Sequence, residues 1–579
     1  MKKLTTVLVF LSAFLFANEW VNPVVDQEIS DMLNKDQLAT GKIQIRVGKL
    51  LIIEEEEKNS APVPAEIDTK SGYILFKRSF MAPVYYSTKP AREELNPVSL
   101  EYFAAPGHYG NITLGLVPLE NGALRVDISD LKNGKGEIFK ADNIEIRSVK
   151  HLLKKVSPGI VKVMPEMIIR ENPVKLYKDV TKLLWLMPYV PEGTNPGSYE
   201  GVISLKLDGK EKREVKLKLE VMPFKLLTDP EKSFGWFCSP TDEVGLKDYK
   251  KHEYNSVSSG FECPVKAVSG GKAKLDFTKM DKTIEVLKKC GLGNYRNHVS
   301  LINTYQELNT FGLKDFTPEY NAVYKNVLEQ IRDRAAQNNI KLVYWLVDEP
   351  REEMLNAFNR NFADTLKLAR LAKEVKGIET YQDIMQDTQF TDALISEFIA
   401  TFDIMSPHCT FKYCPKIIAE TKRQKKQLWL YNSSVGRFGF TTWKHGAVAR
   451  TEWAYNCALN ERTARNIDTW TSIRPGDPAC SVVYPTAKEV IPSPTFEWAS
   501  QGIVDYRYIY TLEQSIESAL QSGTEEAKTA AGRAAAKLQS IKKLTPEYAD
   551  SKTNYEVGIE DKWRREIAEE TVKLQKFMK

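Results

Sequence analysis

The sequence pattern changes near residue 230, and this change limits the fold more than any other feature. Before that point, short stretches alternate apolar and polar side chains, beginning with Gly41–Val47. Later, Gly201–Leu207 and Val215–Val221 alternate in the same way around Asp208-Gly209, a pattern typical of a β-hairpin. Alternation with a period of two buries one face of a strand and exposes the other. We therefore expect an antiparallel β-sandwich in which each sheet has one solvated face.

After Phe234, short apolar stretches alternate with longer amphipathic ones, which indicates strands alternating with helices. The predicted strands are Phe234–Phe237, Tyr295–Leu301, Leu342–Val347, Ile378–Ile384, Phe402–Met405, Leu428–Tyr431 and Ala447–Trp453, with one more between Tyr254 and Phe277. The predicted helices are Lys282–Cys290, Tyr320–Gln337, Phe362–Lys376, Thr391–Ile399 and Lys416–Lys425. About eight such units in about 280 residues match the size of a (β/α)8 barrel. A doubly wound open sheet is the alternative, but no G-x-G-x-x-G motif follows the first strand.

These patterns predict a multidomain chain with α/β and all-β parts. We expect a signal peptide at residues 1–17, an N-terminal β-sandwich domain at 18–228, a (β/α)8 TIM-like catalytic barrel at 229–515 and a C-terminal helical segment at 516–579. The first segment combines Met1-Lys2-Lys3 with a short apolar run and the small residue Ala17. The run is too short to span a bilayer, so we expect no membrane span and export to the periplasm or the medium.

Composition and motifs limit which partners and cofactors the chain is expected to bind. The chain has 81 basic and 76 acidic residues, and its basic residues are dispersed, so the sequence does not indicate a nucleic-acid partner. The seven cysteines lie between Cys238 and Cys480 and include no C-x-x-C pair, although Cys409 and Cys414 are close enough in sequence to form a disulfide. No H-E-x-x-H motif is present, and the six histidines are scattered. We therefore predict no metal and no cofactor.

Two adjacent acids, Asp348 and Glu349, stand directly after the fourth predicted barrel strand, Leu342–Val347. In a βα-barrel, residues at the C-terminal tip of a strand face the substrate. Neighbouring carboxylates at such a place are costly, because burial and mutual repulsion both oppose their ionisation. A structural alternative is a helix start, with Pro350 at the first helical position and an acid near the positive end of the helix dipole. The catalytic interpretation assigns Glu349 as a proton donor whose pKa is raised by Asp348.

Aromatic side chains near the predicted strand ends are candidates for packing against a flat apolar face of a substrate. We expect Tyr431, Trp453, Tyr455 and Trp236 to contact the substrate, whereas Trp345 is expected in the core. For each of them, a role in core packing is the alternative, because aromatics on strands are usually buried.

Polar residues on the same strands are candidates for binding polar groups of a substrate. Arg296 and Asn297 lie on the third predicted barrel strand, where Arg296 also suits an acidic substituent. His298 beside them is expected to be a hydrogen-bonded core histidine. Asn432, at the tip of the seventh strand, is either a ligand for a hydroxyl or amide group or a turn former.

Three separated segments resemble glycoside hydrolase family 123, whose catalytic part is also described as the DUF4091 domain. They are Leu184–Pro191 with Asn195–Gly201, then Val347-Asp348-Glu349-Pro350, then Tyr484-Pro485 with Gln501–Tyr506, the last similar to the family's closing G-I-x-D-Y segment. They occur in the family's order over residues 180–510. One departure is Pro494–Glu497, where many relatives carry an arginine.

The resemblance implies a β-N-acetylgalactosaminidase that works by substrate assistance. In such enzymes the 2-acetamido oxygen of the sugar attacks C1, which gives an oxazolinium intermediate and retained configuration. Asp348 would orient and stabilise the acetamido group, and Glu349 would be the general acid/base. The implied substrate is an oligosaccharide, a polysaccharide or a glycoconjugate.

The residues themselves leave two other functions open. One is a barrel glycosidase for a sugar without an acetamido group, which needs a separate carboxylate nucleophile about 5–5.5 Å from the acid. The seventh strand, the usual place for it, ends Leu430-Tyr431-Asn432-Ser433-Ser434 without an acid, so Asp383 and Glu452 are the candidates, each with a structural role as the alternative. The other is a non-catalytic glycan-binding protein, because a barrel fold alone does not establish catalysis.

Overall fold

A computed structural model describes residues 44–47, 50–53, 59–157, 160–352, 360–385, 390–432, 437–456, 481–486, 488–550 and 557–577. The predicted signal peptide, residues 1–17, lies outside these ranges. Within them, no helix has the length and apolar character that crossing a membrane requires.

The N-terminal part contains two seven-stranded sheets. The first has the order β1 (Gln44–Val47), β2 (Leu50–Ile53), β10 (Ile160–Ile169), β9 (Ile144–Ser157), β12 (Lys182–Pro188), β5 (Ile112–Pro118) and β3 (Tyr73–Phe76). The second has the order β11 (Val174–Leu176), β6 (Gly122–Ile128), β13 (Gly197–Leu207), β14 (Arg213–Val221) and β4 (Ser99–Ala104), with β7 (Leu131–Asn133) beside β13 and β8 (Ile138–Phe139) beside β7. Most pairs are antiparallel, while β2–β10 and β4–β14 are parallel.

The two sheets share a core, as the alternating pattern predicted. Leu114 and Leu184 of the first sheet and Leu205 and Leu217 of the second belong to one buried cluster. Strands β13 and β14 form the predicted hairpin, and their side chains alternate between buried and more exposed positions. This second sheet therefore has the expected solvated face.

The first sheet differs from the expectation of one solvated face. All seven residues of β5 and all seven of β12 are buried. A second buried cluster, which includes Phe80 and Trp185, lies apart from the shared core, and Trp498 from the C-terminal part packs against it. The indole nitrogen of Trp498 donates a hydrogen bond to the Phe80 carbonyl at 2.6 Å. The additional cover explains why these strands are more continuously apolar than a half-solvated strand would be.

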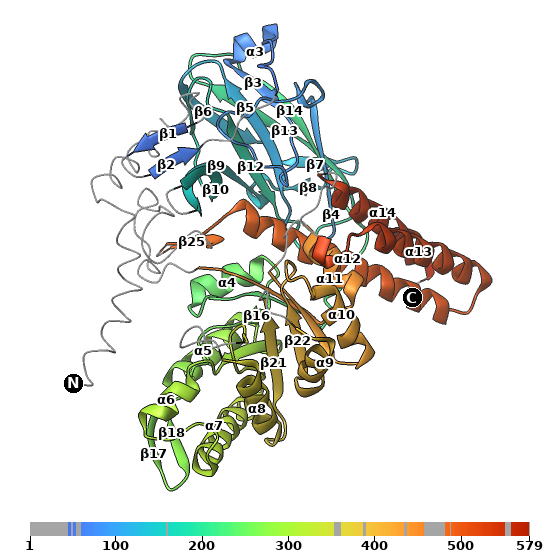
Figure 1. The fold of residues 1–579 in the computed structure, drawn as a ribbon. Helices are drawn as coiled ribbons and strands as arrows, with labels where there is room; N and C mark the ends of the chain where they lie inside the picture. Colours follow the sequence, from blue (N-terminus) through green and yellow to red (C-terminus); the bar gives the residue numbers. More distant parts are fainter. Residues whose placement is uncertain are drawn as a thin grey trace.

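The second half of the chain forms an eight-stranded parallel sheet with helices between its strands (Figure 1). Its strands, in chain order, are β15 (Ser233–Trp236), β16 (Ser256–Val257), β19 (Arg296–Ser300), β20 (Lys341–Trp345), β21 (Glu379–Ile384), β22 (Ile404–Pro407), β23 (Gln427–Tyr431) and β24 (Ala449–Glu452). Its helices are α4 (Glu243–Lys251), α5 (Thr278–Cys290), α7 (Pro318–Gln337), α8 (Phe362–Lys373), α9 (Asp392–Thr401), α10 (Cys414–Arg423) and α11 (Phe438–His445). The predicted hidden strand is β16, and β20 is the fourth strand as expected.

The order of strands in space is β16-β15-β24-β23-β22-β21-β20-β19, so the two edges of the sheet are β16 and β19. Side chains bridge these edges. The amide oxygen of Asn297 on β19 accepts a hydrogen bond from the Val257 backbone N–H on β16 at 2.9 Å, and the Ser256 hydroxyl donates to the Arg296 carbonyl at 2.7 Å. The sheet is therefore nearly closed, with the strand sequence that the (β/α)8 prediction requires.

Smaller elements complete the described structure. They are helices α3 (Glu66–Ser71) and α6 (Thr304–Thr310), and the antiparallel pairs β17 (Val265–Ser269) with β18 (Lys272–Leu275) and β25 (Val483–Pro485) with β26 (Val490–Pro492).

Three C-terminal helices, α12 (Pro494–Gln521), α13 (Glu525–Leu544) and α14 (Ile559–Leu574), pack on one another. Helix α12 runs between the N-terminal sheets and the eight-stranded sheet, and it continues through the predicted domain boundary at residues 515 and 516 (Figure 1). Arg564 of α14 donates a hydrogen bond to Asp505 of α12 at 2.6 Å, so the G-I-x-D-Y segment holds the last helix in place.

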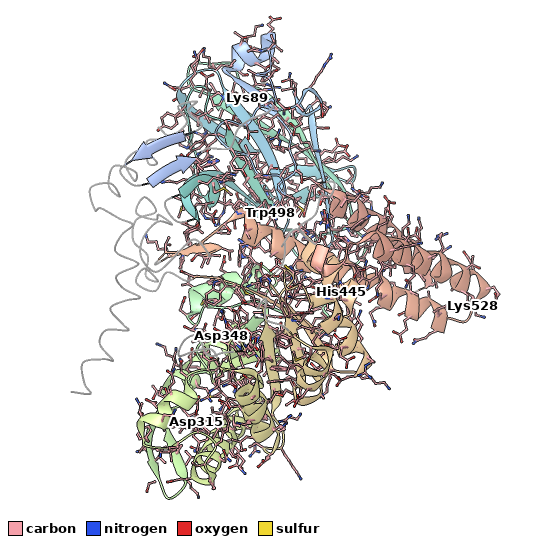
Figure 2. The ribbon with its side chains drawn as sticks, viewed as in Figure 1. Lys89, Asp315, Asp348, His445, Trp498 and Lys528 are labelled. Carbon is pink, nitrogen blue, oxygen red and sulfur yellow. The ribbon has the colours of Figure 1, made fainter. Side chains whose placement is uncertain are left out.

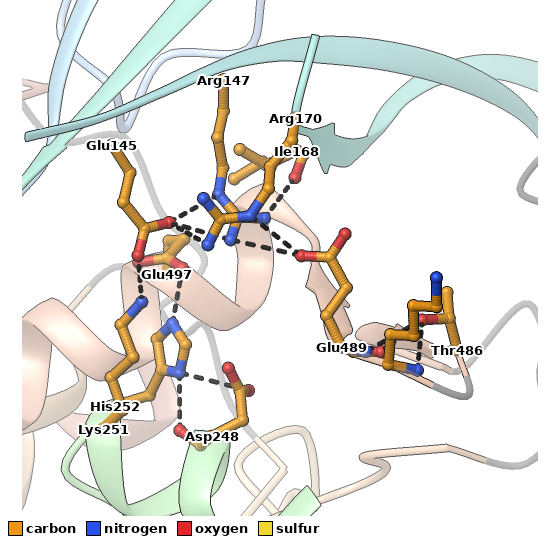
Figure 3. Close-up of polar contacts among 11 residues, drawn as sticks. Glu145, Arg147, Ile168, Arg170, Asp248, Lys251, His252, Thr486, Glu489 and Glu497 are labelled. Carbon is orange, nitrogen blue, oxygen red and sulfur yellow. Dashed lines mark hydrogen bonds and ion pairs between the residues drawn. The ribbon is translucent and has the colours of Figure 1, made fainter. Parts of the chain in front are cut away.

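Charged side chains join the N-terminal sheets to the barrel part (Figure 3). Glu145 of β9 accepts hydrogen bonds from Lys251 of α4 at 2.8 Å and from Arg147 at 2.9 Å. Next to Lys251, His252 lies 2.9 Å from Glu497 of α12. Despite the desolvation that burial causes, the cations around it lower the pKa of Glu145 to about 2, so this connection is charged at neutral pH.

Candidate active site

The Asp348-Glu349 pair follows strand β20, whose last four residues are buried. Both acids are half-buried, and Asp348 lies within the barrel part of the molecule (Figure 2). Glu349 has a φ of 37°, a left-handed backbone conformation that costs free energy for a residue other than glycine and that often marks a functional site. The next described helix, α8, begins at Phe362 with Asn361 as its N-cap. The acids therefore do not cap the start of α8.

The side chain of Glu349 is held from the seventh strand. The Tyr431 hydroxyl donates a hydrogen bond to Glu349 Oε1 at 3.0 Å, and Arg351 Nη2 lies 4.0 Å from Glu349 Oε2. The Glu349 side chain keeps 15 % of its surface exposed, so it can meet a substrate. Burial and the nearby acids raise the pKa of Tyr431, so its hydroxyl stays protonated and remains a donor.

The pKa of Asp348 is raised. Burial, and after it the charge of Glu349, raise this pKa to about 6, while a hydrogen bond with Asp383 and the charge of Arg351 oppose the shift. The two acids have different neighbours. Asp348 contacts the buried Asp383, whereas Glu349 accepts a hydrogen bond from Tyr431 and lies 4.0 Å from Arg351.

Three predicted substrate-binding residues lie together at the same end of the sheet. Tyr431 contacts Glu349 directly, and Asn432 follows it with a φ of 48°. The Asn432 side-chain oxygen accepts a hydrogen bond from the Trp453 backbone N–H at 2.5 Å. Trp453 is 45 % exposed, which leaves its indole face available to a sugar ring. Tyr431, Asn432 and Trp453 thus border the site on the side of strands β23 and β24.

Phe237, which sequence reasoning missed as a site residue, organises this aromatic group. Its ring centroid lies 5.0 Å from Trp345, 5.6 Å from Tyr431 and 6.3 Å from Trp453. His408, also missed, packs edge-on against Tyr431 at 5.5 Å. Both follow barrel strands directly, β15 and β22, and that position was the available signal.

Arg296 and Asn297 make structural contacts instead of the predicted substrate contacts. Arg296 pairs with Lys341 at the N-terminal ends of β19 and β20, the end of the sheet opposite to Asp348, and it forms ion pairs with Glu231 and Glu379. Asn297 is fully buried and joins the edges of the sheet. Their position at the start of β19, rather than at its tip, explains the correction.

Trp236 and Tyr455 also turn away from the acids. Trp236 is 1 % exposed and packs against Tyr254 and Phe496 of the surrounding helices and loops. Tyr455 packs against Tyr249 and lines a separate cavity of about 300 Å³ beside the loop after β15, and neither Asp348 nor Glu349 lines that cavity. Alternation along the strand places Trp236 on the outer surface of the sheet.

His298, which was expected in the core, and Glu452, for which a structural role was the alternative, are both buried in the barrel part. His298 is fully buried among the rings of Phe237, Tyr381 and Trp429, and burial lowers its pKa to about 3. Glu452 is 2 % exposed and forms an ion pair with Arg450 at 2.6 Å. Glu452 therefore has the structural role that was its alternative.

Metal ligands are not grouped in the part of the chain that the structure describes, where no set of three or more His, Cys, Asp and Glu side chains could hold an ion. The five cysteines in these ranges, Cys409 and Cys414 among them, form no disulfide with one another.

Comparison with known proteins matches part of the N-terminal region to a family model. Residues 117–207 match the model of the glycoside hydrolase 123 N-terminal domain. The predicted resemblance to glycoside hydrolase family 123 is confirmed. No curated protein sequence matches the chain. The matched residues run from the end of β5 through β13, so the family 123 match lies in the two N-terminal sheets.

Among solved structures, a family 123 glycoside hydrolase from Clostridium perfringens, described for glycolipid glycan hydrolysis, aligns with a TM-score of 0.61 at 12 % identity. The alignment covers 87 % of this chain and 98 % of that one, so the likeness extends over both halves of the fold. A GH30 endoxylanase from Clostridium papyrosolvens aligns with a TM-score of 0.27 at 10 % identity, over 38 % of this chain and 65 % of that one. A GH5 xyloglucanase from Bacteroides ovatus aligns with a TM-score of 0.26 at 8 % identity, over 72 % and 99 %.

Proposed function

We propose that the chain is an exported retaining glycosidase that cleaves β-linked N-acetylhexosaminides, with β-GalNAc as the preferred sugar, through an oxazolinium intermediate. The observation that carries the proposal is the pair Asp348 and Glu349, held at the tip of the fourth strand by different neighbours. The resemblance to family 123 supports the choice of sugar. The basic and apolar residues 1–17 support export.

The two acids have the properties that the two roles require. Glu349 is partly exposed and close to a tyrosine hydroxyl and an arginine, so it can give a proton to the leaving oxygen and later take one from water. Asp348 ionises with a pKa of about 6, so at neutral pH it carries the charge that would stabilise the acetamido group as positive charge develops. In this mechanism the substrate supplies the nucleophile, and the protein supplies the two carboxyl groups.

The alternative with a separate carboxylate nucleophile is disfavoured by the positions of its candidates. Asp383 is 1 % exposed, and its Oδ1 accepts hydrogen bonds from Trp345 at 3.0 Å and Gln382 at 3.1 Å. Glu452 is occupied by Arg450. A carboxylate buried in this way cannot approach the anomeric carbon of a bound sugar without a rearrangement of its strand.

A substrate screen tests the proposed activity. Chromogenic β-GalNAc, β-GlcNAc and β-galactoside substrates should be compared at pH 7, and turnover is expected for the two acetamido sugars, with β-GalNAc fastest. Turnover of the β-galactoside alone would contradict the mechanism, because that sugar has no acetamido oxygen. Glycan binding without turnover on a broad panel would favour the non-catalytic alternative.

Variants of the two acids test the assigned roles. Asp348→Asn and Glu349→Gln should each lower kcat/KM by about 100-fold or more, because each removes a charge or proton used in the transition state. Glu352→Gln is the matched control, since Glu352 is an exposed carboxylate three positions away and should retain full activity. Near-native rates in both site variants would remove the assignment.

Inhibition by a thiazoline tests the intermediate. The oxazolinium is a bicyclic cation, and a stable thiazoline ring of the same shape should bind far more tightly than the substrate. Asp348→Asn should weaken this inhibition more than Glu349→Gln does, because Asp348 is assigned to the ring nitrogen. Equal inhibition of all three proteins would contradict the assignment of Asp348.

A further inference from the structure

A cavity of about 590 Å³ lies where the N-terminal sheets, the barrel part and helix α12 meet. Tyr109 and Tyr189, from loops next to the N-terminal sheets, line it together with the ends of helices α4 and α5. Arg507 of α12 lines it as well. The volume of this cavity is in the range of small-molecule binding sites, about 300–1,000 Å³.

The cavity lies at the end of the barrel that is opposite to the two acids. Asn255 and Tyr295, which line it, directly precede strands β16 and β19. They therefore mark the N-terminal ends of barrel strands, whereas Asp348 and Glu349 follow the C-terminal end of β20. A ligand in this cavity would not reach the proposed catalytic acids.

Positive charge dominates the lining of this cavity. Its basic side chains are Lys225, Lys247, Lys250, Lys251, Lys289 and Arg507, and its acidic side chains are Glu192 and Glu253. Two acids outside the lining also pair with these cations: Glu145 pairs with Lys251 (Figure 3), and Glu243 pairs with Lys247 and Lys289. Six cations against these four acids leave an excess of two positive charges.

Lys250 is the cation of this group that is free to meet a ligand. It is exposed, and it forms no ion pair within the part of the chain that the structure describes. Its ammonium lies beside Gly291, the C-cap of α5, so closely that a Cβ on Gly291 would be 2.6 Å from Lys250 Nζ. The partial negative charge at the end of a helix attracts this ammonium but does not neutralise it.

Helix stabilisation is the structural alternative for these lysines. Lys250, Lys251 and Lys289 lie in the last turns of α4 and α5, where a lysine is favourable without any ligand. Lys225 and Arg507 lie in neither turn, yet they line the same cavity. Helix stabilisation alone therefore does not account for the whole basic group.

Three tyrosines add flat rings and hydroxyl groups to the lining. The rings of Tyr109 and Tyr189 stack with their centroids 4.4 Å apart, and Lys251 Nζ lies 4.6 Å from the Tyr109 centroid. Tyr109, Tyr189 and Tyr295 are half-buried, so part of each side chain stays accessible. Burial, and after it the charge of Glu145, raise the pKa of Tyr109 to about 12, so its hydroxyl stays protonated and can donate a hydrogen bond. Aromatic rings beside ammonium groups suit a sugar that carries a negative charge.

We propose that this cavity is a second, non-catalytic binding site for an anionic saccharide, in which Lys250 and the neighbouring cations hold a sulfate or carboxylate group and the tyrosines contact the sugar. A single inorganic anion would fill only a small part of a cavity of this volume. The choice of a sugar rests on the proposed function, whereas binding here requires neither turnover nor the acids Asp348 and Glu349. Such a site would retain a charged glycan on the protein independently of catalysis.

Titration calorimetry at low ionic strength tests the proposal, with a sulfated chondroitin tetrasaccharide as the probe. Lys250→Glu should weaken binding about tenfold or more, because an attracting charge becomes a repelling one. Glu349→Gln should retain this binding, because the cavity lies at the other end of the sheet. Added salt should weaken binding to the native protein, because the cations are exposed to solvent. Equal affinity of Lys250→Glu and the native protein would overturn the proposal.

The matched control is Lys528→Glu, which makes the same change of net charge elsewhere. Lys528 is an exposed lysine at the outer end of the C-terminal helices, and it does not line the cavity (Figure 2). This variant should bind the tetrasaccharide as the native protein does. A loss of affinity equal to that of Lys250→Glu would show a dependence on net charge alone and would overturn the assignment to the cavity.

Two further probes separate the contribution of the sugar from that of its charge. An uncharged tetrasaccharide of GlcNAc should show no binding that Lys250→Glu changes, and inorganic sulfate at the same molar concentration should not displace the sulfated tetrasaccharide. Binding of the uncharged sugar that falls in Lys250→Glu would overturn the role of the cations. Displacement by inorganic sulfate would show a site for simple anions and would overturn the choice of a saccharide.

A measurement on the native protein covers the case that Lys250→Glu does not fold. N-hydroxysuccinimide acetate modifies accessible amines, and mass spectrometry of the peptides gives the rate of acetylation at each lysine. The sulfated tetrasaccharide should slow acetylation of Lys250 and Lys225 and leave that of Lys528 unchanged. Equal rates at Lys250 with and without the tetrasaccharide would overturn the proposal.

Failure of this inference and failure of the proposed function give different results. Binding of the sulfated tetrasaccharide that depends on Lys250, without turnover of any acetamido sugar, would retain the second site and remove the proposed function. Turnover of the chromogenic β-GalNAc substrate, without binding that depends on Lys250 and without protection of Lys250, would do the reverse.

Discussion

The Tyr431 hydroxyl donates a hydrogen bond to Glu349 Oε1 at 3.0 Å and so connects the seventh strand to the fourth at the C-terminal end of the eight-stranded sheet. The seventh strand is the usual place for a separate nucleophile, and this chain has an uncharged donor there. A donor in this position orients the general acid and leaves the attack on the anomeric carbon to the substrate. The contact therefore agrees with a single acid/base at the tip of the fourth strand.

Tyr431→Phe should lower kcat/KM about 10- to 100-fold, because a hydrogen bond to a charged group contributes about 1.5–3 kcal/mol. The phenyl ring keeps the contacts with Phe237 and His408, so Tm should change little. Steady-state kinetics at several pH values would measure the effect. Activity equal to that of the native protein would show that Tyr431 does not act on Glu349.

Trp453→Ala should raise KM about 3- to 10-fold with little change in kcat, because the exposed indole offers an apolar face to the sugar in the ground state and the transition state alike. Trp453→Phe is the matched control and should recover most of the affinity. A fall in kcat at unchanged KM would instead place Trp453 among the groups that act only in the transition state.

The sequence predicted that the acid pair, Tyr431, Asn432 and Trp453 would lie at strand tips, and they do, because each ends or follows a strand whose apolar run is clear. Their roles stay predictions. The sequence misplaced Arg296 and Asn297, which lie at the start of their strand. Position along a strand decides which end of the sheet a side chain occupies, and a shift of a few residues in the expected boundary changes that end.

Long-range partners could not be predicted in the same way. The contact of Asp348 with Asp383 joins residues 35 positions apart, and the burial that raises the pKa of Asp348 comes from the packing of the whole barrel end. The second buried face of β5 and β12 belongs to a cluster against which Trp498, far away in sequence, also packs. Such contacts arise from packing rather than from a local pattern.

The corrected role of Asn297 gives a prediction about stability instead of binding. Asn297→Ala should lower the free energy of unfolding by about 1–3 kcal/mol, because the Val257 N–H at the sheet edge loses its acceptor inside the protein. Thermal unfolding would show a lower Tm, and KM should remain close to the native value. A higher KM at unchanged Tm would restore the predicted substrate contact.

His252 makes the stability of the whole chain depend on pH at the boundary between the N-terminal sheets and the barrel. Burial alone would lower the pKa of His252, but Asp248 and Glu497 outweigh burial and raise this pKa to about 10. The imidazolium therefore stabilises the fold fully at pH values below the pKa of an unfolded histidine, about 6.5. This stabilisation is lost as the pH rises through about 10. His252→Gln should therefore lower Tm by several degrees at pH 6.5 and by progressively less toward pH 10, because the buried Glu497 and the half-buried Asp248 lose their cation. Scanning calorimetry at a fixed scan rate would measure the Tm of both proteins. Lys247→Gln is the control, because it breaks only a surface ion pair with Glu243 and should change Tm very little. A difference in Tm that stays constant from pH 6.5 to 10 would mean that His252 stabilises this boundary by packing alone.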